Sequence, residues 1–350
     1  MGNTATAITD TRGLVPERHV VLLGAGASIA ALPNGDANGY KLPSMPNFIE
    51  TVSDLEIYLS SHNIKHDGNI ETLYSELALN PANKDHLRKI EAIIRAYFSQ
   101  LQLPESPTLY DHLIFSLRKK DVIATFNWDP FLYQAYNRVG EIVGQDHLPH
   151  LAFLHGEVSI GACLECGISG SYGKLCNKCN KALEPVKLLY PIAQKNYQND
   201  PFIRTSWHDL NIGLEQAYIF TIFGYSAPKS DAEAVELLKS GWNESHERRT
   251  EEIEVIDIKN REEIKKTWKP FIYNEHQRIY TKQHGNPEDD LDFYDSLIAQ
   301  HPRRSCDALF DALMMNNPRT KTPINRHASW GELRSWVAAY LDIEKQTVVV

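Results

Sequence analysis

Short apolar runs that end in small or polar residues recur along this chain, and they constrain its fold more than any other feature. HVVLL at 19–23 is followed by GAGAS, DVIATFNWD at 121–129 ends in polar residues, and LAFLHG at 151–156 ends in His-Gly. AYIFTIFGYS at 217–226 repeats the design, and IEVIDI at 253–258 is a further apolar run. Buried parallel strands have this composition. Because ligands bind at the carboxyl ends of such strands, we expect the four clusters to converge on one site.

The glycine-rich turn at 24–28 stands where an α/β sheet binds a dinucleotide. Glycines there let the backbone approach a pyrophosphate, and the next helix offers its N-terminus to the anion. The full GxGxxG is absent, so a plain tight turn explains these residues equally well. The segment 31–47, rich in Pro, Gly and Asn, is expected to be a long loop of the kind that often acts as a lid.

Helices are expected over most of the remaining chain. Residues 48–117 carry apolar residues at helical spacing, which we attribute to packing. A helix is predicted at 232–240, and a mixture of loop and helix at 259–285. From about residue 289 onward, DLDFYDSLIAQ, CDALFDALMM and WGELRSWVAAYL predict amphipathic helices separated by Pro-containing breaks.

Two Cys-x-x-Cys pairs lie nine residues apart, shortly after a His-Gly pair. Four thiolates in two such knuckles form a tetrahedral zinc site, and four protein ligands leave no open position for water. A single pair would fit a redox site as well, whereas two pairs near the turn-favouring Gly167 and Asn177 favour a structural zinc. The predicted ligands are Cys163, Cys166, Cys176 and Cys179.

Composition excludes several classes of protein. The 350 residues, 42% of them hydrophobic, suffice for one large domain or two ordinary ones. A net charge of -9 and the lack of a basic block argue against direct binding of nucleic acid. Five cysteines, no disulfide set and no signal peptide fit a reducing cytoplasm. No apolar stretch approaches the roughly 18 residues of a membrane span, so none is predicted.

We therefore predict an α/β fold: a Rossmann-like parallel sheet with an inserted four-cysteine zinc module, helical insertions and a C-terminal helical extension. Residues 1–17 would form a flexible arm, and 18–156 with 186–285 the Rossmann domain. The zinc module would be an insertion at 157–185 and the helical extension would span 286–350. That extension could mediate a homo-oligomer, dock a regulatory protein partner, or only cover the sheet.

The ordered set of motifs resembles the sirtuin superfamily over about residues 19 to 260. GAGAS is similar to its phosphate loop, and TFNWD at 125–129 to its Thr-x-Asn-x-Asp strand end. His155 and Gly156, followed at the family interval by the first cysteine pair, resemble its catalytic histidine and zinc module. The GYS at 224–226 is similar to its Gly-x-Ser ribose contact.

This resemblance implies a pocket for NAD, with Asn127 holding the nicotinamide ribose or a water, Asp129 contacting the carboxamide, and His155 acting as general base. An amide and a base of near-neutral pKa suit cleavage of an N-glycosidic bond through an oxocarbenium-like transition state. Taken alone, Asn127 could be a turn residue and His155 a core histidine. The resemblance implies a cofactor-binding set of Gly24, Ala25, Gly26, Ala27, Ser28, Thr125, Asn127, Asp129, Gly224, Tyr225, Ser226 and Asp257, with Ile258 beside the adenine.

Other segments depart from protein-deacylating sirtuins. Phe126 stands where they have Gln, ALPNGDANGYKLPSMPNF lacks their Phe-Arg segment, and KLLYPIAQKNYQND replaces their peptide-pairing strand. The peptide groove is therefore in doubt while the NAD pocket is retained. Tyr-Pro-Ile near 190, the Trp207 helix and Asp231 after GYS are similar to the stand-alone bacterial sirtuin-like proteins of anti-phage defence, many of which lack a zinc module.

The resulting prediction is an NAD+ hydrolase that gives nicotinamide and ADP-ribose and acts in bacterial anti-phage defence by depleting NAD. Two alternatives stay open. The zinc module and the interval from His155 to Cys163 favour a deacylase or an ADP-ribosyltransferase, and a non-catalytic sensor of NAD or ADP-ribose would need no turnover. The expected partners are NAD, further copies of the chain and a regulatory protein, without nucleic acid or membrane.

Overall fold

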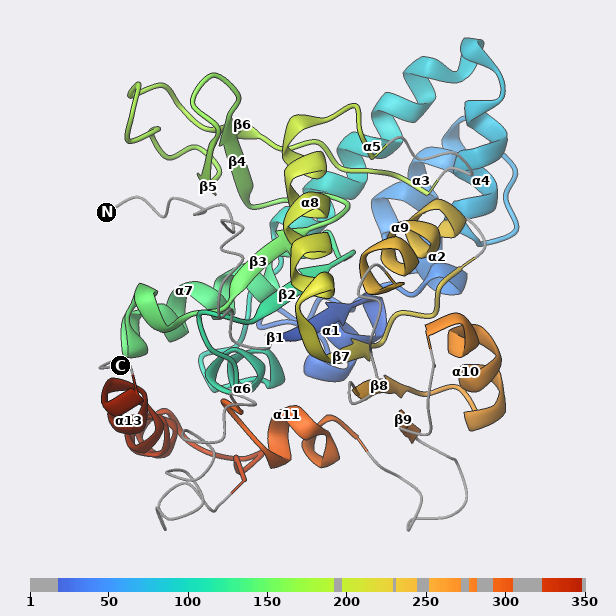
Figure 1. Ribbon diagram of the computed structural model, residues 1–350. Helices are drawn as coiled ribbons and strands as arrows, with labels where there is room; N and C mark the ends of the chain where they lie inside the picture. The colour runs from blue at the N-terminus through green and yellow to red at the C-terminus, as the bar shows by residue number, and fades with distance from the viewer. Residues whose placement is uncertain are drawn as a thin grey trace.

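The computed structural model of this protein is an α/β structure in which helices pack on both faces of one parallel sheet and a small second sheet projects from it (Figure 1). This architecture confirms the predicted fold class, including the inserted cysteine module and the helical C-terminal segment. No helix within the described ranges is long and apolar enough to cross a membrane. The structure describes residues 18–191, 197–228, 231–243, 252–271, 277–281, 292–304 and 323–347.

The central sheet has six parallel strands in the order β3-β2-β1-β7-β8-β9. Leu22 of the first strand pairs with Ala124 on one side and with Ile222 on the other. The chain order reverses between β1 and β7, and such a switch point is where doubly wound sheets bind ligands. The strands are β1 (Arg18–Leu23), β2 (Val122–Thr125), β3 (His150–Phe153), β7 (Ala217–Phe223), β8 (Glu252–Asp257) and β9 (Gln277–Thr281).

Alternation along the buried strands divides the core into two halves. Val20 and Leu22 face one hydrophobic cluster, and Val21 and Leu23 face the other, because successive side chains of a strand point to opposite faces. The first half is covered by α8 (Pro201–Glu215), α9 (Ala232–Asn243) and α10 (Arg261–Trp268). Both faces of the sheet are therefore shielded from solvent, which explains the nearly continuous apolar runs in its strands.

The second half of the core lies under the helices that follow the first two strands and under the C-terminal helices (Figure 1). Their apolar stripes, such as Ile90 and Ile94, are buried. The helices are α1 (Ala25–Ala31), α2 (Phe48–Thr51), α3 (Ser53–Ser61), α4 (Ile70–Ala78), α5 (Lys84–Ser99), α6 (Leu109–Phe115), α7 (Phe131–Val143), α11 (Leu297–Gln300) and α13 (Trp330–Thr347).

A buried polar chain fastens α11 to the sheet. Thr221 Oγ1 donates to Glu254 Oε2 at 2.8 Å, and the backbone N–H of Leu297 donates to Glu254 Oε1 at 2.8 Å. His19 Nε2 lies 2.8 Å from Thr221 Oγ1, which has already given its hydrogen to Glu254, so the imidazole is the donor. Burial lowers the pKa of His19 to about 4, so the ring is neutral at physiological pH.

An ion pair holds α13 against the rest of the domain. The Arg303 side chain is fully buried, and its Nε donates to Glu344 Oε1 at 2.6 Å. Its Nη1 donates to the carbonyls of Phe115, the last residue of α6, and of Leu117. Burial alone would raise the pKa of Glu344, but the charges of Arg303 and Arg118 outweigh it and hold the pKa below its ordinary value. The described C-terminal segment is thus built into the core.

The structure tests two of the sequence expectations, and two others fall outside the residues that it describes. The region 259–285 contains a strand, β9, that was not predicted, because its short sequence QRIYT is largely polar; among the described strands it pairs with β8 alone. The predicted loop 31–47 is shorter in the structure, because Ala31 ends α1 and Met45–Asn47 is a 3-10 helix. Asp36 fastens the loop between them by accepting hydrogen bonds from the backbone of Asn38, Tyr40 and Gln102. The arm at 1–17 and the predicted helix CDALFDALMM lie outside the described residues.

Candidate functional site at the carboxyl edge of the sheet

The polar clusters that follow five neighbouring strands meet at one edge of the sheet. The backbone N–H of Leu154 donates to Thr125 O, and that of Phe126 to Leu23 O, so the ladder continues past the strand ends. In the same way Gly24 donates to Phe223 O and Gly224 to Ile256 O. The ends of β3, β2, β1 and β7 are therefore in register along one edge, as expected for the four clusters, and the end of β8 joins them.

At the switch point the two glycine turns touch through their backbones. The N–H of Gly26 donates to Gly224 O at 3.0 Å. A Cβ on Gly24 would lie 2.5 Å from Gly224 O, and one on Gly224, whose φ is +65°, would lie 2.2 Å from Ala27 N. Close packing of the β1–α1 turn on the β7 turn is thus a sufficient reason for these glycines. Phosphate binding by Gly24, Ala25, Gly26 and Ala27 stays a prediction.

Behind this junction lies a buried polar network. Asn127 Nδ2 donates to Gly24 O and to Ser28 Oγ, each at 2.9 Å. Ser28 Oγ donates to Asp129 Oδ2 at 2.7 Å and is 2.6 Å from the hydroxyl of Tyr110. All four side chains in this network are less than a tenth exposed. Three residues of the predicted set are thus brought together, and Tyr110 joins them without having been predicted.

The turn after β2 fixes the Asn127 backbone as well. Its N–H donates to Thr125 Oγ1 at 3.0 Å, so the predicted Thr125 acts on the site through the backbone of Asn127. Burial raises the pKa of Asp129 to about 6, although hydrogen bonds from Ser28 and from the Phe131 N–H partly offset it. Asp129 therefore changes its charge near neutral pH, which is the range in which a catalytic carboxyl is most useful.

His155, beyond the end of β3, lies among aromatic rings. Its ring centroid is 4.7 Å from that of Phe126 and 5.8 Å from the nearly parallel ring of Tyr197. A hydrogen bond of 3.1 Å joins His155 Nε2 to the hydroxyl of the fully buried Tyr197. Phe126 also stacks on Tyr225, with centroids 4.3 Å apart. Phe126 thus packs between residues at the ends of β2, β3 and β7. The sequence did not predict Tyr197, because no motif contains it.

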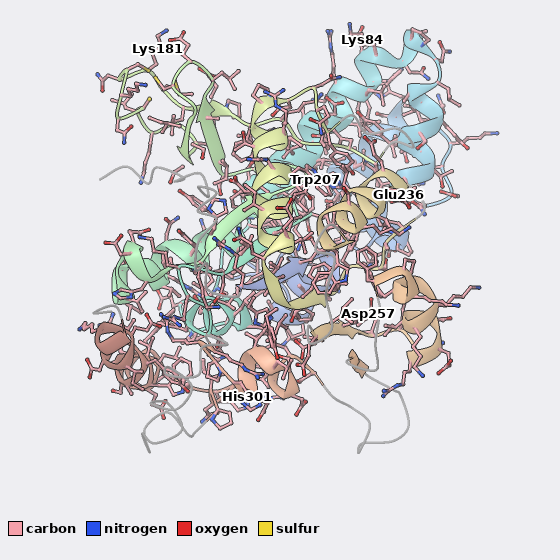
Figure 2. All side chains as sticks on the ribbon, viewed as in Figure 1. Lys84, Lys181, Trp207, Glu236, Asp257 and His301 are labelled. Carbon is pink, nitrogen blue, oxygen red and sulfur yellow. The ribbon has the colours of Figure 1, made fainter. Side chains whose placement is uncertain are left out.

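The remaining residues of the predicted set follow β7 and β8. Tyr225 is buried, and its hydroxyl donates to Asp231 Oδ2 at 3.2 Å, whereas the neighbouring Ser226 is exposed. Asp257 is half-buried at the end of β8, where Figure 2 labels it, and accepts from the N–H of Lys259. Ile258 is 82% exposed. Their proposed roles toward the adenosine stay predictions.

Glu157, two residues after His155, is a buried carboxyl that the sequence analysis did not single out. Its oxygens accept from the N–H and the hydroxyl of Ser159, at 2.8 to 2.9 Å. Burial is the main reason that its pKa is raised to about 8; the Ser159 hydrogen bonds oppose the shift, the charge of Asp129 adds to it, and Arg95 opposes it. Hydrogen bonding to Ser159 shapes the turn that leads into the small sheet, which gives Glu157 a structural reason to be there.

The four predicted zinc ligands come together in the small sheet, whose strands β4 (Ile160–Cys163), β5 (Ile168–Ser171) and β6 (Glu184–Pro185) are antiparallel. Their sulfur atoms all lie within 4.8 Å of one another, so the cluster could hold a metal ion. Each knuckle closes on a residue with positive φ four positions after its first cysteine, at Gly167 (65°) and Asn180 (61°). In the second knuckle this residue is Asn180, whereas the sequence analysis named Asn177. Figure 2 labels Lys181 in this projecting sheet.

Comparison with known proteins gives only distant likenesses. No protein-family model and no curated protein matches the sequence. A solved Sir2 homologue–NAD complex is similar over 75% of this chain and 84% of its own, at 16% identity and a TM-score of 0.39. A second structure, described for the mechanism and regulation of Sir2 enzymes, is similar over 75% of this chain and 87% of its own, at 12% identity and a TM-score of 0.38. A structure of Sir2 bound to acetylated peptide is similar over 77% of this chain and 88% of its own, at 14% identity and a TM-score of 0.34. At these values the likeness is too distant to assign a reaction, so the chemistry of the site rests on its own residues.

Proposed function

We propose that this protein is a sirtuin-like NAD+ glycohydrolase. The main support is that Asn127 and Asp129, after the end of β2, are hydrogen-bonded to the GAGAS segment after β1 at the switch point of the sheet. Doubly wound sheets bind dinucleotides at this place. His155 extends from the next strand on the β2 side, and Phe126 is in contact with it.

The reaction can be written with these side chains alone. The bond between C1′ of the ribose and the nicotinamide nitrogen breaks, and its electron pair neutralises the pyridinium. Positive charge develops on the ribose, as in glycoside hydrolysis. A water oxygen bonds to C1′, and His155, acting as general base, takes a proton from that water. Above about pH 6 Asp129 is an anion that can accept a hydrogen bond from the carboxamide N–H of nicotinamide.

Water is favoured as the attacking group by the residue at position 126. Phe126 packs between His155 and Tyr225, so the wall beside the histidine is apolar. An apolar ring offers no hydrogen bond to an acyl oxygen or to a peptide. The chain also lacks the deacylase segments at 31–48 and 187–200.

Two other candidate functions each have one observation in their favour. The clustered cysteines, which we propose bind a structural zinc ion, favour a deacylase or an ADP-ribosyltransferase, since the motif resemblance links that module to such enzymes. The hydrogen bond between His155 Nε2 and Tyr197 favours a sensor of NAD or ADP-ribose, because it engages one of the two ring nitrogens that a general base could use.

The proposed biological role is depletion of NAD during bacterial anti-phage defence, in the cytoplasm. It is supported by the motif resemblance and by the missing peptide-binding segments. An unregulated NAD+ hydrolase would harm its own cell, so we propose that assembly with further copies or with a regulatory protein controls it.

The test compares matched variants in one NAD-cleavage assay. Asn127→Ala and His155→Ala should each abolish nicotinamide release while their circular dichroism stays that of the wild type. His66→Ala is the control, because His66 lies 3.5 Å from Glu56 of α3, outside the polar network, and should keep full activity. Turnover in both site variants at the wild-type rate would refute the assignment.

A further inference from the structure

Tyr110 contributes a buried phenol to the polar network, although no motif contains it. It lies on α6 and is 1% exposed. Its hydroxyl oxygen is 2.6 Å from Ser28 Oγ and 3.4 Å from Asn127 Nδ2. Three separate segments, α6, α1 and the turn after β2, therefore meet at this hydroxyl.

Counting hydrogens fixes the direction of these bonds. An ionised Asp129 can only accept, so Ser28 must give its single hydrogen to Asp129 Oδ2. Ser28 Oγ can then accept two bonds, of which Asn127 Nδ2 supplies one. Tyr110 must supply the other. The donors therefore run from Tyr110 to Ser28 to Asp129, and the Ser28 hydroxyl has no capacity left for a phosphate.

The same count fixes the Asn127 amide. Its two Nδ2 hydrogens go to Gly24 O and to Ser28 Oγ. No hydrogen bond to Asn127 Oδ1 is found in the described part of the chain. The amide is thus held by its nitrogen end, and its carbonyl oxygen is the end left to accept a hydrogen bond from outside the network.

We propose that Tyr110 is a positioning residue of the cleavage site, which acts through Ser28 to hold the Asn127 amide with Oδ1 free to accept a hydrogen bond from the attacking water. This inference rests on the proposed function. It also reassigns Ser28 from phosphate contact to the support of Asn127 and Asp129. Removing the phenol oxygen leaves Ser28 with one donor fewer and loosens the amide that it orients.

Contacts at the start of α6 hold Tyr110 in place. Thr108 donates to Asp111 Oδ2 from its N–H and its hydroxyl, at 2.6 and 2.7 Å, which caps the start of α6. Arg138 of α7 pairs with the fully buried Asp111, with its Nε 2.6 Å from Oδ1. A capped and charge-paired first turn limits how far Tyr110 can shift when its partners change.

The pKa of Asp129 reports on this chain of donors. Burial raises the pKa of the Asp129 carboxyl, and hydrogen bonds from Ser28, from the Phe131 N–H and from its own backbone N–H lower it. The charge of Asp129 in turn raises the pKa of the neighbouring Tyr110 and Glu157. Because Tyr110 donates to Ser28, it polarises the Ser28 hydroxyl and strengthens the bond to Asp129. Loss of the phenol should therefore raise the pKa of Asp129 above about 6.

The test compares Tyr110→Phe with Tyr74→Phe. Tyr74 is also buried and loses one bond, to Glu91, but it lies outside the network. In Tyr110→Phe, kcat for NAD cleavage should fall about tenfold, which is the change in rate expected from the loss of one hydrogen bond. KM should stay within about twofold of the wild-type value. Tyr74→Phe should keep both constants. A kcat in Tyr110→Phe equal to that of Tyr74→Phe would overturn the proposal.

A second readout works without turnover. The carboxyl carbon of Asp129, labelled with carbon-13 and assigned by its loss in Asp129→Asn, is titrated by NMR. Its midpoint should move to higher pH in Tyr110→Phe and stay in place in Tyr74→Phe, and an unmoved midpoint in Tyr110→Phe would refute the donor chain. If the midpoint moves while the wild type cleaves no NAD, the proposed function fails and the network stands. If NAD is cleaved and Tyr110→Phe keeps full kcat, this inference fails and the function stands.

Discussion

Removing the carboxylate of Glu344 should strongly destabilise the protein. Arg303 is 0% exposed and Glu344 is 8% exposed, so the substitution Glu344→Ala leaves a buried guanidinium whose side-chain partners among the described residues are the carbonyls of Phe115 and Leu117. Breaking a buried pair from one side typically costs about 3–5 kcal/mol. The expected result is a lower free energy of unfolding by about that amount.

Urea unfolding followed by tryptophan fluorescence measures this change, with the midpoint shifted and the slope unchanged. Arg303→Met combined with Glu344→Leu removes the buried pair and should recover part of the loss, because two well-packed apolar residues can replace such a pair while the contact of Arg118 with Glu344 is still lost. Asp146→Ala, which breaks the exposed pair with Lys119, is the control and should leave the midpoint in place. A Glu344→Ala variant within about 1 kcal/mol of the wild type would refute the view that α13 belongs to the core.

The same pair predicts a dependence of stability on pH. The pKa of Glu344 is held below its ordinary value in the folded protein. Its contribution is therefore fully present above the ordinary pKa of glutamate and is lost as the pH falls through the lowered, folded value. Glu344→Ala should flatten the fall in unfolding free energy over that acidic range, and an unchanged slope would contradict this.

Three further results are expected. Cys176→Ser should melt below the wild type and release zinc to a colorimetric chelator, since structural zinc contributes to folding; wild-type melting with retained zinc would exclude a metal site. Gly224→Ala should destabilise the protein and weaken NAD binding in calorimetry, because its φ is +65° and its Cβ would meet Ala27 N at 2.2 Å; unchanged stability would show that the turn can relax. The rate of NAD cleavage should rise with pH around the pKa of about 6 of Asp129, where the carboxyl ionises, and an unaltered acid limb in Asp129→Asn would assign that limb to another group.

The sheet could be predicted from the sequence because its strands are buried on both faces. Such strands are continuous apolar runs, and four of them end in a cluster that helix or loop formation does not require. The edge strand β9 lacked this signal, since only two of its five residues, Ile279 and Tyr280, are apolar. The cysteine spacing was equally informative, because tetrahedral ligation demands it.

Part of the candidate site could not be predicted because its members act through tertiary contacts. Tyr110 stands in an apolar helix, where an aromatic residue normally signals packing, and only the Thr108–Asp111 capping pair marked the helix start. Tyr197 meets His155 from a segment without a motif. Ser28 carried a motif, but its hydroxyl faces Asp129 and Tyr110, which a pattern of residue types does not reveal.

The most direct test of the central claim is to incubate the purified full-length protein with NAD alone and to quantify nicotinamide and ADP-ribose by chromatography. We predict equimolar nicotinamide and ADP-ribose, formed without any acylated peptide and lost in His155→Ala. Release of nicotinamide only after an acylated peptide is added, with O-acyl-ADP-ribose as the product, would contradict the account and identify a deacylase.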